Sequence, residues 1–137
     1  MADHPHLETF RRVYEAFSGG DMATLRTLLA EDVVWHTPGR HPIAGDYTGR
    51  QATLDSFERE LELSGGTYAV AVHDVLANDA HTVALLHVTA EREQKRLDQD
   101  YALVFHIRDG VINEAWELWT DQAACDRFWS DAAIGRR

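Results

Sequence analysis

A glutamate in an apolar strand is the residue whose surroundings point most directly to chemistry. Residues 111–120 alternate, and one face of this predicted strand carries Ile112, Glu114, Trp116 and Leu118. Apolar neighbours disfavour the charged form of a carboxyl group, so the pKa of Glu114 is expected to rise toward values that suit a general acid or base. Glu114 is therefore the first candidate catalytic residue. The structural alternative is a glutamate at the end of a sheet that pairs with an arginine or contacts solvent.

A tryptophan and a histidine occur side by side just before a loop rich in proline and glycine. The predicted strand 33–37 contains Trp35 and His36, and loops at the open end of a sheet often carry functional residues. Alternation places Trp35 on the same face as Val33 and Thr37, which makes it a predicted pocket wall, and turns His36 to the other face. His36 is a candidate for proton transfer, and the alternative is a structural hydrogen bond to a backbone carbonyl.

Further polar side chains are candidates for catalytic roles. His87 lies in the middle of an apolar strand, where a neutral imidazole needs a hydrogen-bond partner, and it serves either in catalysis or as a satisfied sheet residue. Asp121 follows a predicted strand and is either the N-cap of the last helix or a group at the mouth of a pocket. Tyr14, on the first predicted helix, and Tyr101 could donate a hydrogen bond to a developing oxyanion.

Aromatic residues recur on the predicted helices and strands, and they are candidates for the walls of an apolar cavity. A sheet that curves around helices leaves a cone whose interior is not always filled by side chains. The alternative is ordinary core packing. The residues expected to bind a substrate in this way are Phe17, Trp35, Tyr47, Phe57, Tyr101, Phe105 and Trp116.

The sequence lacks the patterns that bind metals or common cofactors. Its 8 histidines include no HExxH pair and no comparable ligand pair on one helix face. The glycine-rich motifs of dinucleotide and phosphate binding and the serine elbow of hydrolases are also absent. We therefore expect neither a metal nor a cofactor.

Composition and charge limit the partners and the compartment. The 137 residues contain 13 Lys and Arg against 23 Asp and Glu, and the formal net charge of −10 would repel the phosphates of a nucleic acid. No apolar run approaches the roughly 18 residues that span a bilayer, and the first residues lack the features of a signal peptide. The single Cys125 cannot form an internal disulfide, which fits a reducing compartment. We expect a soluble, cytoplasmic protein with no nucleic-acid or membrane partner.

The periodicity of apolar residues predicts an α+β architecture. The helices are expected around residues 10–17, 25–29 and 54–61, and the strands over residues 33–37, 68–76, 82–90, 100–107 and 111–120. Proline and glycine in residues 38–49 predict a long loop. We expect three N-terminal helices packed on one face of a curved antiparallel sheet, in a single domain over residues 1–137 with an ordered core of about 6–130.

Several predicted strands carry apolar residues on both faces, and both faces of such a sheet must be covered. The strand over residues 100–107 shows this clearly, because Leu103, Val104 and Phe105 are adjacent. The helices cover one face, and a second copy of the chain is the simplest cover for the other. We therefore expect a homodimer formed through the sheet. We also expect each copy to bind a small apolar ligand.

Five sequence blocks occur in order along most of the chain. They are residues 16–21 (AFSGGD), 28–39 (LLAEDVVWHTPG), 43–50 (IAGDYTGR), 104–112 (VFHIRDGVI) and 114–129, which begins with EAW and ends with DRFW. Together they resemble the SnoaL-like branch of the NTF2-like (ketosteroid-isomerase-like) superfamily. The resemblance implies an NTF2-like cone of α+β type, an apolar pocket that opens near the proline–glycine loop, and dimers through the sheet.

That superfamily includes steroid isomerases, polyketide cyclases, dehydratases, epoxide hydrolases and non-catalytic binding proteins, so the fold alone does not settle the function. Three positions that match catalytic residues of the steroid isomerases differ here: Thr37 replaces an aspartate base, Val13 a tyrosine and Leu103 a protonated aspartate. Isomerisation of steroids by that mechanism is therefore not expected.

These observations lead to one preferred function and one alternative. The preferred function is a cofactor-independent acid/base enzyme, of the isomerase, cyclase or dehydratase type, that acts on a small apolar molecule such as a polyketide-like or terpenoid-like intermediate. Glu114 would act as general acid or base, with His36, His87 or Asp121 as its partner. The alternative is a non-catalytic small-molecule binding or accessory protein of the same fold.

Overall fold

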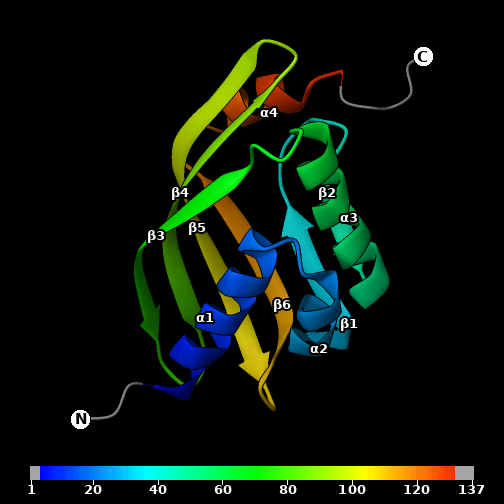
Figure 1. Ribbon diagram of the computed structural model, residues 1–137. Coiled ribbons are helices and arrows are strands. Elements are labelled where there is room, and N and C mark those ends of the chain that lie inside the picture. The colour runs from blue at the N-terminus through cyan, green and yellow to red at the C-terminus, as the bar shows by residue number, and fades with distance from the viewer. Residues whose placement is uncertain (1–3, 132–137) are drawn as a thin grey trace.

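The computed structural model describes residues 4–131, and the remaining residues of the expected 1–137 domain lie outside the described part. The elements in chain order are α1 (Pro5–Ser18), α2 (Met22–Leu28), β1 (Leu29–Thr37), β2 (Gly45–Thr48), α3 (Arg50–Leu63), β3 (Ala69–Ala77), β4 (Thr82–Arg92), β5 (Lys95–Arg108), β6 (Val111–Trp119) and α4 (Gln122–Trp129). The six strands form one sheet in the order β2-β1-β6-β5-β4-β3, with α1, α2 and α3 over one face and α4 at one end (Figure 1). None of the helices in this part of the chain is long and apolar enough to cross a membrane.

The first two helices begin and end where the sequence places capping residues. Pro5 occupies the first turn of α1, where the N–H that it lacks is not needed. Gly20 follows the helix with a φ of 66°, the left-handed conformation that glycine adopts without strain. The Asp21 carboxylate then accepts a hydrogen bond from the Thr24 N–H at 3.0 Å and caps α2. The short turn between these caps lets α1 and α2 pack on each other.

The sheet is mixed, and this corrects the expectation of an antiparallel sheet with three N-terminal helices. β1 pairs in parallel with β6, while the other neighbouring strands of the described sheet pair antiparallel. Only α1 and α2 precede the sheet, because the chain forms β1 and β2 before α3. β2 falls within residues 38–49, where the sequence predicts a loop, and pairs with β1. Parallel pairing joins strands that are far apart in the chain, so local periodicity does not reveal it.

β6 contains one extra residue that changes which face its side chains occupy. The register against β5 jumps between the pairs His106–Glu114 and Ile107–Ile112, so Asn113 is an inserted residue. A β-bulge of this kind shifts the alternation of a strand by one position. Beyond the bulge the odd-numbered residues of β6 point toward the helices, and Glu114 points away from them.

Two groups of buried side chains hold the helices on the sheet. The larger group lies between the sheet and the first three helices and includes Phe10, Leu25 and Phe105. The smaller group lies under α4 and includes Phe128 and Trp129. Full burial of one large apolar side chain contributes about 1.5–3 kcal/mol. The two groups therefore fix the walls of the space that remains between helices and sheet.

Candidate functional site

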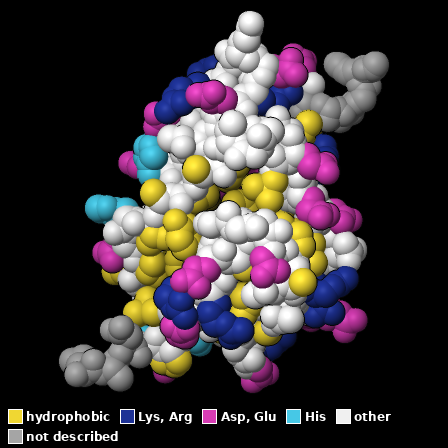
Figure 2. Space-filling model, viewed as in Figure 1, with side chains coloured by type: hydrophobic (Ala, Val, Ile, Leu, Met, Phe, Trp, Pro, Cys, Tyr) yellow, Lys and Arg dark blue, Asp and Glu magenta, His cyan; other side chains and the backbone are white. Residues whose placement is uncertain are grey.

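The space between α1, α3 and the sheet is an apolar cavity. Its volume is about 60 Å³. Hydrophobic side chains gather in the middle of this face of the molecule (Figure 2). Most of the residues that line the cavity are apolar. The exceptions are the carboxyl groups of Glu60 and Glu117 and the hydroxyl groups of Tyr14, Tyr68 and Tyr101.

Aromatic rings form one wall of the cavity. Phe57 on α3 meets the rings of Phe17 and Trp35 edge to face, with centroids 5.6 Å and 4.9 Å away. Tyr68, in the segment between α3 and β3, packs against Phe17 at 5.9 Å. Edge-to-face contacts of this kind are favourable and orient the rings. The wall is therefore a connected set of rings contributed by α1, α3, β1 and the segment before β3.

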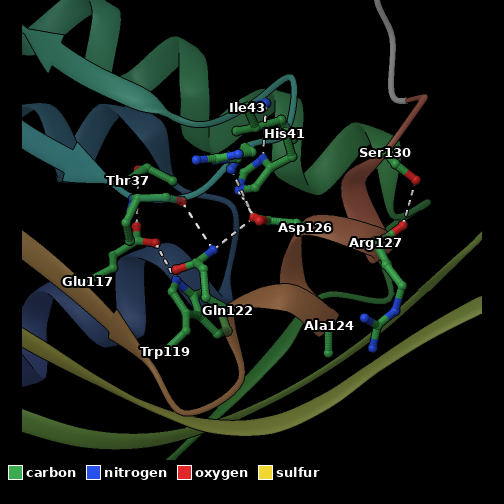
Figure 3. A network of polar contacts seen from close by, with 12 residues as sticks. Thr37, His41, Ile43, Glu117, Trp119, Gln122, Ala124, Asp126, Arg127 and Ser130 are labelled. Carbon is green, nitrogen blue, oxygen red and sulfur yellow. Dashed lines mark hydrogen bonds and ion pairs between the residues drawn. The ribbon is translucent and has the colours of Figure 1, made fainter.

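Glu117 is held in one orientation by three hydrogen bonds. Its Oε2 accepts from Trp35 Nε1 at 2.8 Å and from Thr37 Oγ1 at 3.3 Å, and its Oε1 accepts from Trp119 Nε1 at 3.1 Å. Figure 3 shows the carboxylate between Thr37 and Trp119. The side chain is buried, so these bonds replace the water that would otherwise solvate its charge.

The register of the sheet places those donors beside Glu117. Parallel pairing sets Trp35 opposite Ala115, so two residues further on Thr37 lies next to Glu117. Trp119 follows two residues later on β6 and points to the same face. The site therefore depends on the contact between β1 and β6, which joins residues about 80 positions apart in the chain.

Glu60 is the second carboxyl group of the cavity, and it has no such support. It lies on α3, is 7% exposed, and receives no hydrogen bond to its carboxyl group from the described residues. Burial raises its pKa well above the ordinary value, and the negative charge of Glu117 raises it further, against a smaller opposing effect of Arg59. Glu60 therefore keeps its proton to a higher pH than an exposed glutamate does.

The two carboxyl groups differ because their surroundings differ. Burial also raises the pKa of Glu117, but the hydrogen bonds from Trp35, Trp119 and Thr37 favour its charged form and lower the pKa again. Glu117 consequently loses its proton before Glu60 does. Between the two ionisations the cavity holds one carboxylate and one carboxylic acid.

Tyr68 and Tyr101 are neutral hydroxyl groups of the cavity. Burial and the nearby carboxyl groups raise the pKa values of Tyr68 and Tyr101 well above the ordinary value, so both keep their protons. Tyr101 stacks on Trp119 with centroids 4.2 Å apart, which ties it to the support of Glu117. Tyr14 donates its hydroxyl proton to the Val70 carbonyl at 2.8 Å.

The loop after β1 is tied to α4. Asp126 accepts a hydrogen bond from the Arg40 N–H at 3.1 Å, and Gln122 donates to the Pro38 carbonyl at 3.3 Å (Figure 3). Gly39 has a φ of 118°, and a side chain there would collide with Asp126. No residue of 38–44 is among the described residues that line the cavity, although the resemblance predicts its opening near this loop.

A match over most of the chain identifies the family. Residues 10–115 match the SnoaL-like domain, and this range runs from within α1 to within β6. The chain belongs to the SnoaL-like domain family. The resemblance drawn from the five sequence blocks is thereby confirmed.

Relatives of this SnoaL-like protein span nearly its whole length. The uncharacterised protein Rv0034 of Mycobacterium tuberculosis is 34% identical over 131 residues, which are 95% of this chain and all of the relative. The solved structure of Bal32a, from a soil-derived mobile gene cassette, is 41% identical with a TM-score of 0.88 and covers 91% of this chain and 96% of its own. IdmH, a putative polyketide cyclase from Streptomyces antibioticus, is 23% identical with a TM-score of 0.71 over 86% of this chain and 93% of its own, which shows a shared fold.

Five of the residues predicted from the sequence meet in the cavity. The predicted residues whose side chains line the cavity are Tyr14, Phe17, Trp35, Phe57 and Tyr101. Trp35 points inward, as the alternation of residues 33–37 predicts, and it contacts the carboxylate directly. These five residues come from α1, β1, α3 and β5, so the fold brings together what the sequence separates.

Glu114, His36 and Trp116 lie on the opposite face of the sheet, and the prediction that Glu114 faces the pocket is wrong. His36 bridges Glu114 at 2.8 Å and Asp46 at 2.7 Å, and Trp116 stacks on His36 with centroids 5.4 Å apart. The two carboxylates raise the pKa of His36, chiefly through the hydrogen bond that Glu114 accepts from its ring. The physical reason for the misplacement is the bulge at Asn113, which reverses the faces of β6.

The other predicted residues also lie away from the cavity. His87 bridges Asp98 and Asp100 on the face opposite the helices, at 2.7 Å from each. Asp121 caps α4 by accepting a hydrogen bond from the Ala124 N–H at 3.0 Å. Within residues 4–131 no group of three or more His, Cys, Asp or Glu side chains is arranged to hold a metal ion.

Two aromatic candidates belong to the walls behind the cavity. Phe105 is fully buried against Phe10, with centroids 5.7 Å apart, and does not reach the open space. Tyr47 donates its hydroxyl proton to the Ile43 carbonyl and packs against the core from β2. Both have the core-packing role that the sequence leaves open as the alternative.

The two carboxyl groups of the cavity are absent from the sequence-based candidates. Glu60 carries a usable signal, because it follows Phe57 by three residues and therefore lies on the apolar face of its helix. Glu117 is recognised as a residue that points toward the helices only if the bulge is known. Asn113, a polar residue inside an apolar strand, is the sole local sign of that bulge.

We predict that Glu60 makes the protein less stable as the pH rises. The pKa of Glu60 is raised in the folded state, so above pH 4.5 the unfolded chain loses the Glu60 proton while the folded chain keeps it. The stabilisation present at lower pH is therefore lost as the pH rises through the pKa that Glu60 has in the folded protein. The slope reaches about 1.4 kcal/mol per pH unit. Urea unfolding of wild type and Glu60→Gln between about pH 5 and about pH 8 measures it, and the variant should show a flatter profile.

The matched control is Glu62→Gln, which removes an exposed carboxylate from the same helix. This variant should keep the wild-type slope. Equal slopes in wild type and Glu60→Gln would show that Glu60 is ionised in the folded protein, contrary to its assignment as an acid.

Proposed function

We propose that this SnoaL-like protein is a cofactor-independent acid/base enzyme that acts on a small, largely apolar molecule. The observation that carries the proposal is the pair of buried carboxyl groups, Glu117 and Glu60, which line one apolar cavity and differ in the hydrogen bonds that they accept. Two carboxyl groups whose surroundings separate their pKa values supply a base and an acid at the same pH. Isomerisation, cyclisation and dehydration all use such a pair.

In this proposal Glu117 is the base. Its Oε1 accepts a single hydrogen bond, from Trp119, so a second lone pair is available to take a proton. Burial keeps its pKa above the ordinary value, and it therefore binds a proton more strongly than an exposed carboxylate does. Glu117 is suited to remove a proton from a carbon atom next to the carbonyl group of a bound substrate.

Glu60 is the acid. It gives its proton to the substrate oxygen as Glu117 takes the carbon-bound proton, so the intermediate is a neutral enol and no charge is created. A proton that passes from Glu117 back to Glu60, through the substrate or solvent, restores the starting state. Each group is expected to contribute about 100- to 10,000-fold in rate.

The aromatic wall defines the kind of substrate. Phe17, Phe57 and Trp35 offer flat apolar surfaces, while Tyr68 and Tyr101 offer hydroxyl groups that can donate hydrogen bonds. A polyketide-like or terpenoid-like intermediate, with apolar rings or chains and one or two carbonyl groups, matches such a lining. The similar fold of IdmH, a putative polyketide cyclase, supports the same class of reaction.

We also propose that a second copy of the chain covers the face of the sheet opposite the helices. Leu85, Ala102 and Leu118 lie in register across β4, β5 and β6 on that face. Leu85 is 37% exposed and Leu118 is 56% exposed, so the row offers apolar surface to a partner. A two-fold axis would bring the same row of each copy together and complete the burial of both faces.

We predict that Glu117→Gln lowers proton transfer by about 100-fold or more, because the base is lost. The assay is the exchange of hydrogen for solvent deuterium next to the carbonyl group of β-tetralone, an apolar ketone, followed by NMR. Glu60→Gln should also lose activity. Glu114→Gln, on the opposite face of the same strand, and Glu62→Gln should exchange at the wild-type rate.

The pH profile of the same exchange gives an independent check. The rate should rise as Glu117 ionises and fall as Glu60 ionises, and both limbs should lie above pH 4.5 because burial raises both pKa values.

Full exchange in Glu117→Gln would contradict the proposal. Tight binding of the ketone without exchange in wild type would favour the non-catalytic binding protein instead.

For the dimer we predict that Leu118→Glu produces monomers, since it buries an unpaired charge in the proposed interface. Sedimentation velocity at micromolar concentration should find wild type as a dimer. Val72→Glu, which adds the same charge at an exposed apolar residue of β3 on the helix side of the sheet, should remain dimeric. Monomeric wild type would rule out this interface.

A further inference from the structure

The cavity carries the negative charge of Glu117 without a positive charge. No lysine, arginine or histidine of residues 4–131 lines it. Glu60 is 93% buried, since its exposed fraction is 7%, and its carboxyl group has no hydrogen-bond partner in the described chain. Glu60 lines the open space of the cavity, so a polar group of the ligand can partner its carboxyl group.

The fixed charges oppose a negative ligand. The indole N–H groups of Trp35 and Trp119 already bind the Glu117 carboxylate and are not free to stabilise an anion. In a medium of low dielectric constant, a second negative charge beside Glu117 is repelled and a positive charge is attracted far more strongly than in water. The cavity therefore favours a ligand group with positive charge.

Aromatic rings surround the same end of the cavity as the carboxyl groups. Trp35 contacts Glu117 directly and meets Phe57 at 4.9 Å, and Phe57 precedes Glu60 by one helical turn. A cation within about 6 Å of an aromatic ring is attracted by the negative face of the ring. Carboxyl groups and rings together form the lining that binds organic ammonium groups in proteins.

We propose that the substrate is an apolar molecule with one basic nitrogen, an amine or imine, whose cationic form lies between Glu60 and Glu117 against the aromatic wall. This inference rests on the proposed acid/base function of the same two residues and names the substrate class. The reacting group of the substrate is then a nitrogen and not the carbonyl oxygen described under the proposed function. A protonated nitrogen carries a positive charge, and a positive charge is what this cavity stabilises.

The proton transfers of an imine substrate balance within the site. Glu60 gives its proton to the imine nitrogen and becomes a carboxylate beside the iminium ion. Glu117 removes a proton from the adjacent carbon, the C–H electron pair forms a C=C bond, and the C=N electron pair returns to nitrogen. The product is a neutral enamine. The proton on Glu117 then passes to the Glu60 carboxylate, and no oxidant, reductant or further reactant is consumed.

A pair of probes with the same shape and different charge tests the inference. Benzyltrimethylammonium carries a permanent positive charge, and neopentylbenzene has a carbon in place of the nitrogen. Binding is measured from the change in tryptophan fluorescence, since Trp35 lines the cavity. At about pH 8 the cation should bind at least about 10-fold more tightly than the neutral probe, and the ratio should shrink toward about pH 5 as the carboxyl groups take up protons.

The variants show whether the Glu117 carboxylate causes the preference. Glu117→Gln should reduce the ratio, because it removes the carboxylate, and Glu62→Gln, which removes an exposed charge from α3, should keep it. The inference is overturned if the neutral probe binds as tightly as the cation, if the cation fails to bind at millimolar concentration, or if the ratio survives in Glu117→Gln.

These outcomes are separable from those of the exchange assay. Loss of the cation preference with normal exchange of β-tetralone would leave an acid/base enzyme for neutral ketones and remove the nitrogen substrate. A clear cation preference without exchange would leave an amine-binding cavity and remove the catalytic step.

Discussion

Two carboxyl groups in one apolar cavity impose the constraint on which the rest of the structure depends. Away from water, two neighbouring carboxylates repel each other strongly, so a folded protein keeps both only if one retains its proton. This chain directs three hydrogen-bond donors to Glu117 and, from its described residues, none to the carboxyl group of Glu60. That asymmetry, more than the presence of acidic residues, produces a base and an acid at the same pH.

The topology of the sheet serves this asymmetry. The parallel contact of β1 with β6 brings Trp35 and Thr37 to Glu117, and the bulge at Asn113 turns Glu117 toward the helices. α3, which follows the β1–β2 hairpin, supplies Glu60 from the opposite wall. The buried aromatic side chains around them keep the dielectric constant low, and this strengthens every charge interaction inside the cavity.

The sequence predicts the fold better than the site, and β6 explains why. Periodicity locates the helices and most strands, and it turns Trp35 inward, because these patterns are local. A single inserted residue, Asn113, reverses every face beyond it, so strict alternation selects Glu114 where the cavity contains Glu117. The helical spacing that places Glu60 on an apolar face is readable from the sequence. Its meaning depends on Glu117, which only the three-dimensional fold places in the same cavity.

The protonated state of Glu60 is the central claim, and infrared difference spectroscopy measures it directly. The C=O stretch of a carboxylic acid absorbs at a higher frequency than the bands of a carboxylate, in a region that other protein groups leave nearly empty. At neutral pH the spectrum of wild type minus Glu60→Gln should contain the carboxylic-acid band, and this band should vanish as the pH is raised. A difference spectrum with carboxylate bands alone would contradict the account.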